Sequence, residues 1–481
     1  MSTKLGMGSI SVTELAAMIG VTPVYYGNDK QIELTGVDTD SRTVAEGDIF
    51  VAIPGEKYDG ADFAASAVLS GARCVISARC PDKAEELGKS FAFLQTEDPC
   101  GALSRFATEY KKRRRIRTVA VTGSVGKTTT KEMISAVLSQ KFRVGKTQGN
   151  LNTDIGLSMT VLGFGPETEV AVLEMGMSNF GEIEKLSRIA EPDYGIITNI
   201  GTSHIEFLGS RENIAKAKSE IAVGLREDGM LVLCGDEPLL RPLAGGRHRT
   251  AFVSVYATDC EYRAENIRYS DMKTTFDLIR RGERIGDVVI PALGLHHVYG
   301  ALFAAAIADK FGLTEGEFRE GLLAFRNAAM RQSISDVGGV TVIDASYNAS
   351  PESMRASLSV LCELAAEKNA RKIALLGDMR ELGSETRPQH EKVGEFAASL
   401  GLDLLVTFGI AAVCTAEAAK KAGMPADRVI SELNIAAPEE CARTLAAHLR
   451  KGDCLLVKAS RAVAAEKIIN YLKEHPDFPE K

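Results

Sequence analysis

The chain has 481 residues, of which 45% are apolar and 25% charged, and its formal net charge at pH 7 is -7. One hydrophobic core rarely exceeds about 250 residues, so we expect three domains. The composition is that of a folded globular protein and excludes fibrous and disordered chains. The acidic balance argues against nucleic acid as a partner.

Neither a targeting segment nor a membrane span is predicted. The N-terminal end has no apolar core of signal-peptide length, and no later run of about 18 apolar residues could cross a bilayer. The nine cysteines form no C-x-x-C pair, which favours reduced thiols. We therefore expect a cytoplasmic protein without membrane insertion, and a monomer.

Residues 1–97 alternate short apolar runs with Gly and Asp turns. The pattern predicts a buried strand for DIFVAI at 48–53 and a helix for ADFAASAVLSGA at 61–72. We expect a small α/β domain here.

Residues 98–328 are predicted to form the central domain. A helix is expected from about Ala102 to Lys112, then the strand RTVAVTG, a Gly-rich turn, and the helix KTTTKEMISAVLSQ. Later strands are predicted for VAVLEMG, YGIITNI and GMLVLCG. Because helical segments separate these strands, a doubly wound parallel sheet is the economical prediction.

Residues 329–481 begin a new alternation of strands and helices. Strands are predicted for GVTVIDASY, KIALLGDM, LDLLVTFG and DCLLVKAS, with a helix at SMRASLSVLCELAA. This order favours a Rossmann-like domain, joined to the central one through residues 330–337.

A phosphate-binding loop is predicted between the strand and the helix that begin the central domain. Glycine permits the tight turn and the close approach of backbone N–H groups to phosphate. Lys127 would pair with the β- and γ-phosphates and the Thr128 hydroxyl would ligate magnesium, which indicates ATP and Mg²⁺ as cofactors. This chain lacks the first glycine of the standard P-loop pattern, because Val121 stands at that position. The predicted loop residues are Gly123, Ser124, Val125, Gly126, Lys127, Thr128 and Thr129.

The segment TGSVGKTTTKE resembles the ATP loop of the Mur ligases, the amino-acid-adding enzymes of peptidoglycan synthesis. The likeness continues, in the order of that family, through GNLNTDIG, LEMGMSNFGEI, ITNIGTSHIEFLGS and AKAKSEI. VIDASYNASPESM and LLGDMRELG are similar to the member that adds D-alanyl-D-alanine. TDSRTVAEGDIFVAIPG resembles the UDP-binding part that this member shares with the one adding the third residue.

The resemblance implies a function in cell-wall precursor synthesis. It implies ATP-dependent ligation of D-alanyl-D-alanine to UDP-N-acetylmuramoyl-tripeptide through an acyl-phosphate, giving the pentapeptide, ADP and phosphate. Two magnesium ions are implied. A phosphoryl transfer of this kind needs positioned cations more than a covalent nucleophile, because charge spreads over the phosphoryl oxygens.

Five residues are predicted to carry the reaction. Glu174 follows a parallel strand, at the edge where such sheets bind ligands, and is assigned to magnesium together with Thr128. The resemblance implies a metal-binding role for His204, a carbamylated metal ligand at Lys218 and a γ-phosphate contact for Arg331. The catalytic set is Lys127, Glu174, His204, Lys218 and Arg331.

Other residues are predicted to contact substrate or nucleotide. Asn150 and Asn152 face substrate sugar or diphosphate, or only form a turn. The UDP end is assigned to Ser41, Arg42, Gly55 and Asp59. ATP ribose or the incoming dipeptide is assigned to Asp344, Tyr347 and Asn348, and the closing motif of the family to Lys458, Ser460 and Arg461.

Two features depart from the family pattern. The G-x-H-N-x-x-N segment that contacts adenine reads GLHHVYG, so that His297 and Gly300 replace both asparagines, and Ala345 and Ala459 stand where an acidic residue and a glycine are usual. The alternatives are the ligase that adds the third residue and a non-catalytic nucleotide-binding regulator derived from a Mur ligase.

Overall fold

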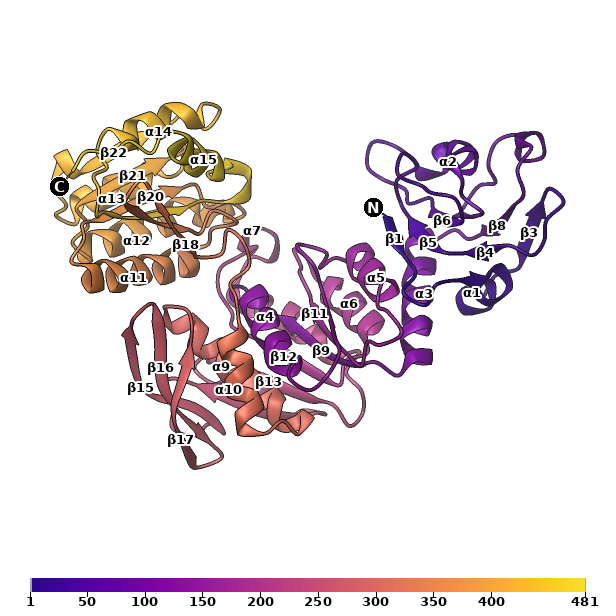
Figure 1. Cartoon of the computed structure of the whole chain (residues 1–481), viewed down its shortest axis with the longest axis horizontal. Helices are drawn as coiled ribbons and strands as arrows, with labels where there is room; N and C mark the ends of the chain where they lie inside the picture. Colours follow the sequence, from indigo (N-terminus) through magenta and orange to yellow (C-terminus); the bar gives the residue numbers. More distant parts are fainter. Residues whose placement is uncertain (1, 481) are drawn as a thin grey trace.

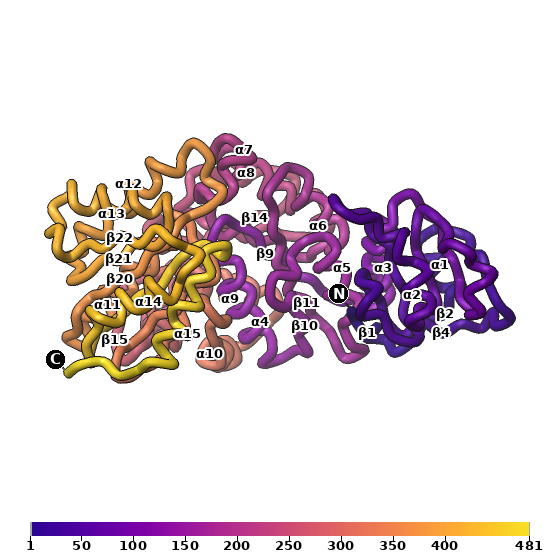
Figure 2. The backbone as a smooth tube through the Cα atoms, turned by 90° about the horizontal axis from the view of Figure 1, so that it is seen from above, coloured from indigo at the N-terminus to yellow at the C-terminus, as the bar shows by residue number. Residues whose placement is uncertain are grey.

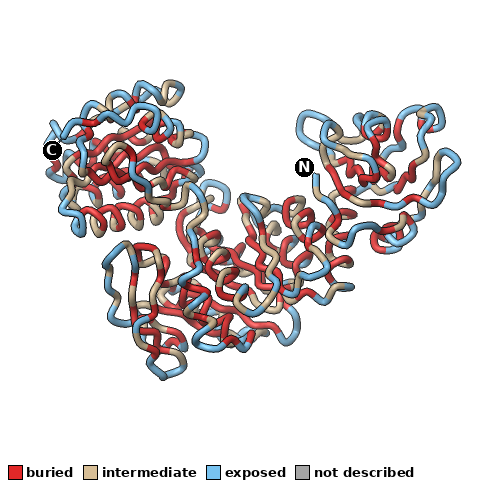
Figure 3. Tube along the Cα trace, in the orientation of Figure 1, coloured by how far each residue is buried: buried red, intermediate tan, exposed pale blue. Residues whose placement is uncertain are grey.

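Three large β-sheets, each built from a consecutive part of the chain, organise the protein (Figure 1). The structure is a computed structural model that describes residues 2–480. The three parts follow one another along the long axis, with the C-terminus at one end (Figure 2). Buried positions concentrate inside each part, and the turns between elements are exposed (Figure 3).

The N-terminal sheet has the order β1-β5-β6-β7-β8-β3. Its inner strands β5 to β8 are parallel, and β1 and β3 pair antiparallel at the edges. The strand bounds are β1 Ser2–Lys4, β3 Pro23–Tyr26, β5 Gly36–Asp38, β6 Asp48–Val51, β7 Cys74–Ser77 and β8 Phe91–Gln95. Helices α1 (Val12–Ile19) and α2 (Ala64–Ser70) and the two-stranded sheet β2 (Ile10–Ser11) and β4 (Glu33–Leu34) complete this part.

The central sheet has nine strands in the order β10-β11-β9-β12-β13-β14-β15-β16-β17. Pairing is parallel from β10 to β15 and antiparallel from β15 to β17. The strand bounds are β9 Arg117–Thr122, β10 Val144–Lys146, β11 Val170–Glu174, β12 Tyr194–Ile197, β13 Met230–Cys234, β14 Arg249–Ser254, β15 Tyr262–Ser270, β16 Lys273–Arg280 and β17 Glu283–Ile290. The helices are α3 Pro99–Arg114, α4 Lys127–Leu138, α5 Asp154–Leu162, α6 Glu182–Ala190, α7 Ile205–Leu208, α8 Arg211–Ser219, α9 Leu295–Phe311 and α10 Glu315–Ala324.

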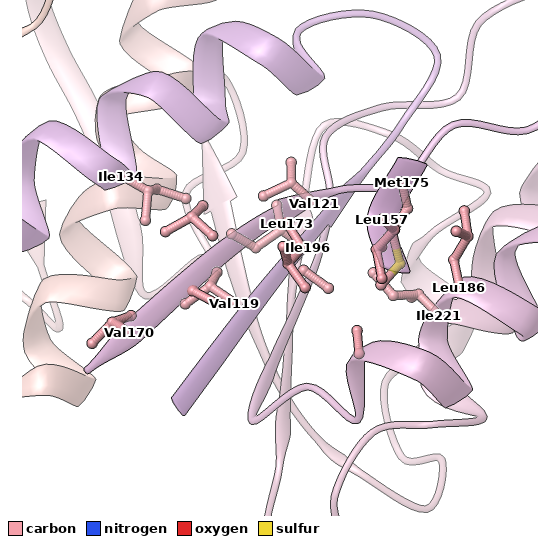
Figure 4. Close-up of a cluster of buried hydrophobic side chains, with 14 of the residues drawn as sticks. Val119, Val121, Ile134, Leu157, Val170, Leu173, Met175, Leu186, Ile196 and Ile221 are labelled. Carbon is pink, nitrogen blue, oxygen red and sulfur yellow. The ribbon is translucent and has the colours of Figure 1, made fainter. Parts of the chain in front are cut away.

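The central strands are apolar on both faces because helices cover the sheet from both sides. Strands β9 and β11 are buried almost throughout, which matches their nearly continuous Val, Ala and Leu runs. Full burial of one such side chain contributes about 1.5–3 kcal/mol. Figure 4 shows this cluster, whose labelled members include Val119, Val121, Ile134, Leu157, Val170, Leu173, Met175, Leu186, Ile196 and Ile221.

The C-terminal sheet has the order β18-β19-β23-β20-β21-β22. All its pairs are parallel except the β18–β19 hairpin. The strand bounds are β18 Ser333–Val337, β19 Val340–Asp344, β20 Lys372–Gly377, β21 Leu404–Phe408, β22 Val429–Glu432 and β23 Cys454–Lys458. The helices are α11 Pro351–Lys368, α12 Thr386–Ser399, α13 Val413–Lys421, α14 Pro438–Ala446 and α15 Glu466–Glu474.

The predicted α/β class with parallel sheets is confirmed, and the structure adds an antiparallel extension of the central sheet that the sequence pattern did not predict. Strands β15 to β17 extend the central sheet as an antiparallel meander. Only one face of this meander packs on the core, so its residues alternate between buried and exposed. The first central helix is also longer than expected, because Asp98 caps it and Pro99 occupies its first position. Within the described part of the chain, no helix is long and apolar enough to cross a membrane.

Candidate active site

The phosphate loop lies between β9 and α4 and is braced by the end of β12. Gly123 has φ +146° and Gly126 has φ +83°, and a Cβ on Gly123 would lie 1.8 Å from Oγ1 of Thr198. Glycine is therefore required at 123 for both conformation and space. Oδ1 of Asn199 accepts a hydrogen bond from the Val125 N–H at 3.0 Å, which fixes the loop before any ligand binds.

Lys127 begins α4 and is held back against its own loop. Its Nζ donates to the carbonyl oxygens of Gly123 at 2.8 Å and Ser124 at 3.3 Å. Burial lowers the pKa of Lys127, the nearby Arg331 lowers it further, and Glu174 opposes both. An arriving polyphosphate would compete for this ammonium, because it offers charge that the two carbonyls lack.

Glu174 lies at the carboxyl end of β11, and its carboxylate is 2% exposed. Oε2 accepts a hydrogen bond from Oγ1 of Thr128 at 2.7 Å, and Oε1 accepts one from Nδ2 of Asn152 at 3.1 Å. The ammonium of Lys131 lies 4.0 Å from Oε2 and donates to the Thr147 carbonyl at 2.6 Å. Lys131 is a charged neighbour of the site that the sequence pattern did not single out.

The pair Thr128 and Glu174 offers hard oxygen atoms, which are the ligands that Mg²⁺ prefers. Within residues 2–480, His, Cys, Asp and Glu side chains nowhere gather in threes as a ready metal centre. Magnesium is usually held by one or two carboxylates together with substrate phosphates, so a site completed by a nucleotide fits these residues.

Lys218 and His204 lie close to the loop in different ways. Lys218, near the end of α8, is 1% exposed, and its burial and the nearby Lys127 lower its pKa well below the ordinary value. Nδ1 of His204, the residue before α7, lies 2.5 Å from Oε2 of Glu381 in the C-terminal part. An ammonium is no metal ligand, so Lys218 fits a metal site only after chemical modification.

The C-terminal part contributes positive charge opposite the phosphate loop. The guanidinium carbon of Arg331 lies 4.1 Å from the ring centre of Tyr347, a stacked cation–π contact. Nζ of Lys458 donates to the Asn348 carbonyl at 2.9 Å. Burial lowers the pKa of Lys458 to about 7, with a further decrease caused by Arg331 and an opposing effect of Asp344.

A cavity of about 1070 Å³ joins these groups between the central and C-terminal parts. Of the predicted residues, those that line it are Ser124, Val125, Gly126, Lys127, Thr128, Thr129, Asn150, Asn152, Glu174, His204, Arg331, Tyr347, Asn348 and Lys458. The cavity lining does not include Gly123, Lys218, Asp344, Ser460 or Arg461. The cavity thus collects most of the predicted nucleotide and metal residues from distant parts of the chain.

Three of the residues outside the lining have local partners. Oδ1 of Asp344 accepts from Oγ of Ser346 at 2.6 Å. Oγ of Ser460 accepts from the Arg380 N–H at 3.0 Å, and Arg461 pairs with Glu466 at 3.0 Å. In this arrangement these contacts support the neighbouring turns.

The residues predicted for the UDP end lie in the N-terminal part and do not line the cavity. The guanidinium of Arg42 pairs with Asp40 at 2.6 Å, while Asp59 caps the turn at Ala61 and pairs with Arg79 at 2.9 Å. A substrate that reaches both this part and the cavity would have to be long.

His297 and Gly300 lie on α9, away from the cavity. His297 is buried, with Nδ1 2.8 Å from the Leu293 carbonyl and Nε2 2.9 Å from Oδ1 of Asn327. Gly300 faces Met133 of α4, at 3.3 Å from where its Cβ would be. His297 is therefore a packed structural residue whose burial lowers its pKa.

Several cavity residues were missed by the sequence analysis. His296, Tyr299 and Phe303 recur at helical spacing on the cavity face of α9, and Tyr256 lies beside them with 72% exposure. Their helical spacing was readable from the sequence, but only the fold brings that face of α9 to the cavity.

Family models match three consecutive parts of the chain. Residues 33–111 match the Mur ligase family catalytic domain, residues 121–308 the Mur ligase middle domain, and residues 330–461 the Mur ligase glutamate ligase domain. The UDP-N-acetylmuramoyl-tripeptide–D-alanyl-D-alanine ligase of Bacillus subtilis is 38% identical over 93% of this chain and 95% of its own length. The chain belongs to the Mur ligase family.

Another curated relative and two solved structures are also similar to this Mur ligase. The Escherichia coli enzyme of that name is 33% identical over 92% of this chain and 95% of its own length. A crystal structure of MurF from Acinetobacter baumannii superposes with a TM-score of 0.86 at 28% identity, covering 98% of this chain and all of that one. MurF from Thermotoga maritima in complex with ADP has a TM-score of 0.81 at 29% identity, over 91% of this chain and 97% of that one.

Proposed function

We propose that this Mur ligase joins D-alanyl-D-alanine to the peptide carboxylate of UDP-N-acetylmuramoyl-tripeptide, with ATP converted to ADP and phosphate. The observation that carries the proposal is the cavity, which places the phosphate loop and Glu174 opposite Arg331 and Lys458. The names of the relatives and the motifs at 342–354 and 375–383 support the choice of dipeptide.

The reaction has two steps. A tripeptide carboxylate oxygen attacks the γ-phosphorus, and the bond from that phosphorus to the bridging oxygen of ADP breaks. The free amine of the dipeptide then attacks the acyl carbon, and loss of phosphate and a proton leaves the amide. Neither step needs a covalent enzyme intermediate, so catalysis depends on positioning and charge.

The residues of this chain would share that work. Lys127 turns from its loop carbonyls to the β- and γ-phosphates, and Arg331 meets the γ-phosphoryl oxygens with permanently charged, forked donors. Asn152 and Thr128 hold the carboxylate of Glu174 in one orientation. When bound there, magnesium would neutralise developing charge on the phosphoryl oxygens.

A second magnesium would require a modified Lys218. The depressed pKa of this buried lysine favours the neutral amine, which can attack the carbon of CO₂ and lose a proton to give a carbamate. That converts a buried amine into an anionic oxygen ligand, with His204 as the neighbouring candidate. We also propose that residues 1–97 hold the UDP end of the substrate, through Ser41, Arg42, Gly55 and Asp59. Residues 98–328 would bind ATP, and residues 329–481 would bind the incoming dipeptide.

One incubation tests the function. Purified protein is given ATP, Mg²⁺, D-alanyl-D-alanine and a UDP-tripeptide ending in lysine or in diaminopimelate, and the product is identified by mass. We expect the UDP-pentapeptide with one phosphate released per amide formed. A parallel reaction with UDP-dipeptide and free lysine or diaminopimelate should give no product, and its success would identify the third-residue ligase instead. Phosphate release that stays at background with every substrate would favour a regulator.

A further inference from the structure

Glu381 and His204 come from different parts of the chain and meet at the rim of the cavity. Their side chains approach to 2.5 Å between Oε2 and Nδ1, and both line the cavity. Within residues 2–480 the structure records no protein partner for Nε2 of His204, which leaves that nitrogen available to a ligand.

The backbone at this contact is unusual on both sides. His204 has φ +65° and Glu381 has φ +62°, although neither is glycine. Such conformations are strained in residues other than glycine and persist only where the surroundings fix them. The Glu206 N–H donates to the Glu381 carbonyl at 3.4 Å, so the two segments are also joined through their backbones.

A second carboxylate of the C-terminal part holds the same segment from its other end. Oε1 of Glu352, in the first turn of α11, accepts hydrogen bonds from the backbone N–H of Thr202 at 3.0 Å and from its Oγ1 at 3.1 Å. The segment from Thr202 to Glu206 is therefore tied at both ends to the C-terminal part, with His204 between the ties.

We propose that Glu381 is a positioning residue that fixes the imidazole of His204, keeping the proton on Nδ1 and Nε2 free as the ligand atom. A histidine that binds metal commonly gives its other ring N–H to a carboxylate, which sets the tautomer and the ring orientation. Here that carboxylate comes from the C-terminal part. The position of the C-terminal part therefore determines whether the His204 ring has the tautomer and orientation needed to bind a metal. The prediction that the bound ion is magnesium rests on the proposed function. The prediction of the His204 tautomer does not depend on that function.

The first experiment reads the tautomer in the metal-free protein. Ring ¹⁵N signals are recorded at about pH 8.5, where ordinary imidazole is neutral, and His204→Gln identifies the His204 signals among the seven histidines. We expect an Nδ1-protonated ring in the unmodified protein and in Glu381→Gln, whose amide oxygen still accepts the proton. Glu381→Ala should shift the ring to a tautomer mixture. Glu385→Gln is the matched control, because within residues 2–480 the hydrogen bond recorded for that carboxylate is with Gln389 on the same part of the chain.

The second experiment measures metal affinity with Mn²⁺ in the presence of ADP. Loss of a carboxylate behind a ligating histidine typically weakens metal binding about 10–100-fold, and we expect that range for the Mn²⁺ site that includes His204 in Glu381→Ala. Glu381 is 48% exposed, so the variant should fold, and its thermal midpoint checks this. Unchanged ring signals together with unchanged Mn²⁺ affinity in Glu381→Ala would overturn the proposal. Absence of pentapeptide with the unmodified protein would instead overturn only the proposed function.

Discussion

Oγ1 of Thr128 donates a hydrogen bond to Oε2 of Glu174 across 2.7 Å, which joins the first turn of α4 to the end of β11. The two residues are brought together because β9 and β11 are neighbouring parallel strands, with Val121 opposite Glu174. The carboxyl ends of both strands therefore open on the same side of the sheet, where ligands bind in such folds.

Glu174→Gln should reduce kcat by at least about 100-fold, because it removes a fixed negative charge beside the phosphate loop. The thermal midpoint should change by only a few degrees, since the amide keeps the shape and one acceptor. Activity is measured as phosphate release, with Glu184→Gln as control. Glu184 is half-buried, and within residues 2–480 the ion pair recorded for its carboxylate is with Arg188 on the same helix. Activity of Glu174→Gln within threefold of the unmodified enzyme would contradict its role.

Arg331→Ala should lower kcat by about 1000-fold, the scale of an arginine that stabilises a transferring phosphoryl group. Arg331→Lys should recover only part of this, because an ammonium lacks the planar fork that stacks on Tyr347. Steady-state kinetics with varied ATP separate kcat from KM. Arg326→Ala is the control, since the bonds recorded for its guanidinium within residues 2–480 go to the backbone carbonyls of Leu323 and Phe325. An equal loss of kcat in Arg331→Ala and in the control Arg326→Ala would point to a structural effect.

Lys458 should make stability depend on pH between about 7 and 10.5. Burial lowers its folded pKa to about 7, from 10.5 for an ordinary lysine. Between these values the unfolded chain binds a proton that the folded chain has released, so stability rises with pH, by up to about 1.4 kcal/mol per unit. Below about pH 7 both states are protonated and the destabilisation is constant.

Lys458→Met removes this buried charge and should raise the thermal midpoint most below pH 7, with the advantage shrinking as pH rises. Thermal unfolding at several pH values checks this against Lys467→Met, which changes an exposed lysine. A Lys458→Met advantage that is independent of pH would refute the assignment.

Lys218 should carry a carbamate when CO₂ is present. Protein equilibrated with ¹³C-bicarbonate should show one carbamate carbon signal that disappears in Lys218→Ala and stays in Lys216→Ala, on the same helix. Activity of Lys218→Ala should fall by at least about 100-fold, because a charged group at the site is lost. Full activity of Lys218→Ala, with and without added bicarbonate, would rule the modification out as a requirement.

His297→Ala should lower the free energy of unfolding by about 1–3 kcal/mol, because the Leu293 carbonyl and the Asn327 amide lose a buried partner. Affinity for ADP should change less than twofold, since His297 does not line the cavity. Denaturation and calorimetric titration measure the two quantities. A large loss of ADP affinity without loss of stability would instead show that His297 contacts the adenine of the nucleotide.

The sequence alone determined the local units of this protein. Strand burial requires the apolar runs of β9, β11 and β12, and the backbone of the phosphate loop requires glycine at 123 and 126. Both requirements are local, so the sequence pattern reveals them. The capping residue Asp98 could have been recognised, but a cap is a signal of only a few residues. The meander β15 to β17 could also have been recognised, but its apolar and polar residues alternate only weakly. The family motifs pointed to Lys127, Glu174 and Arg331 by residue type and spacing.

Only the tertiary structure decided how those units meet. Thr128 and Glu174 touch because of strand order, and His297 faces inward because α9 packs against α4. Glu381 reaches His204 because the C-terminal part packs against α7. These contacts join residues far apart in the chain, and their free energy depends on distance and burial that no local pattern encodes. The sequence therefore indicated the chemistry, and the packing of the three sheets decided which side chains share the cavity.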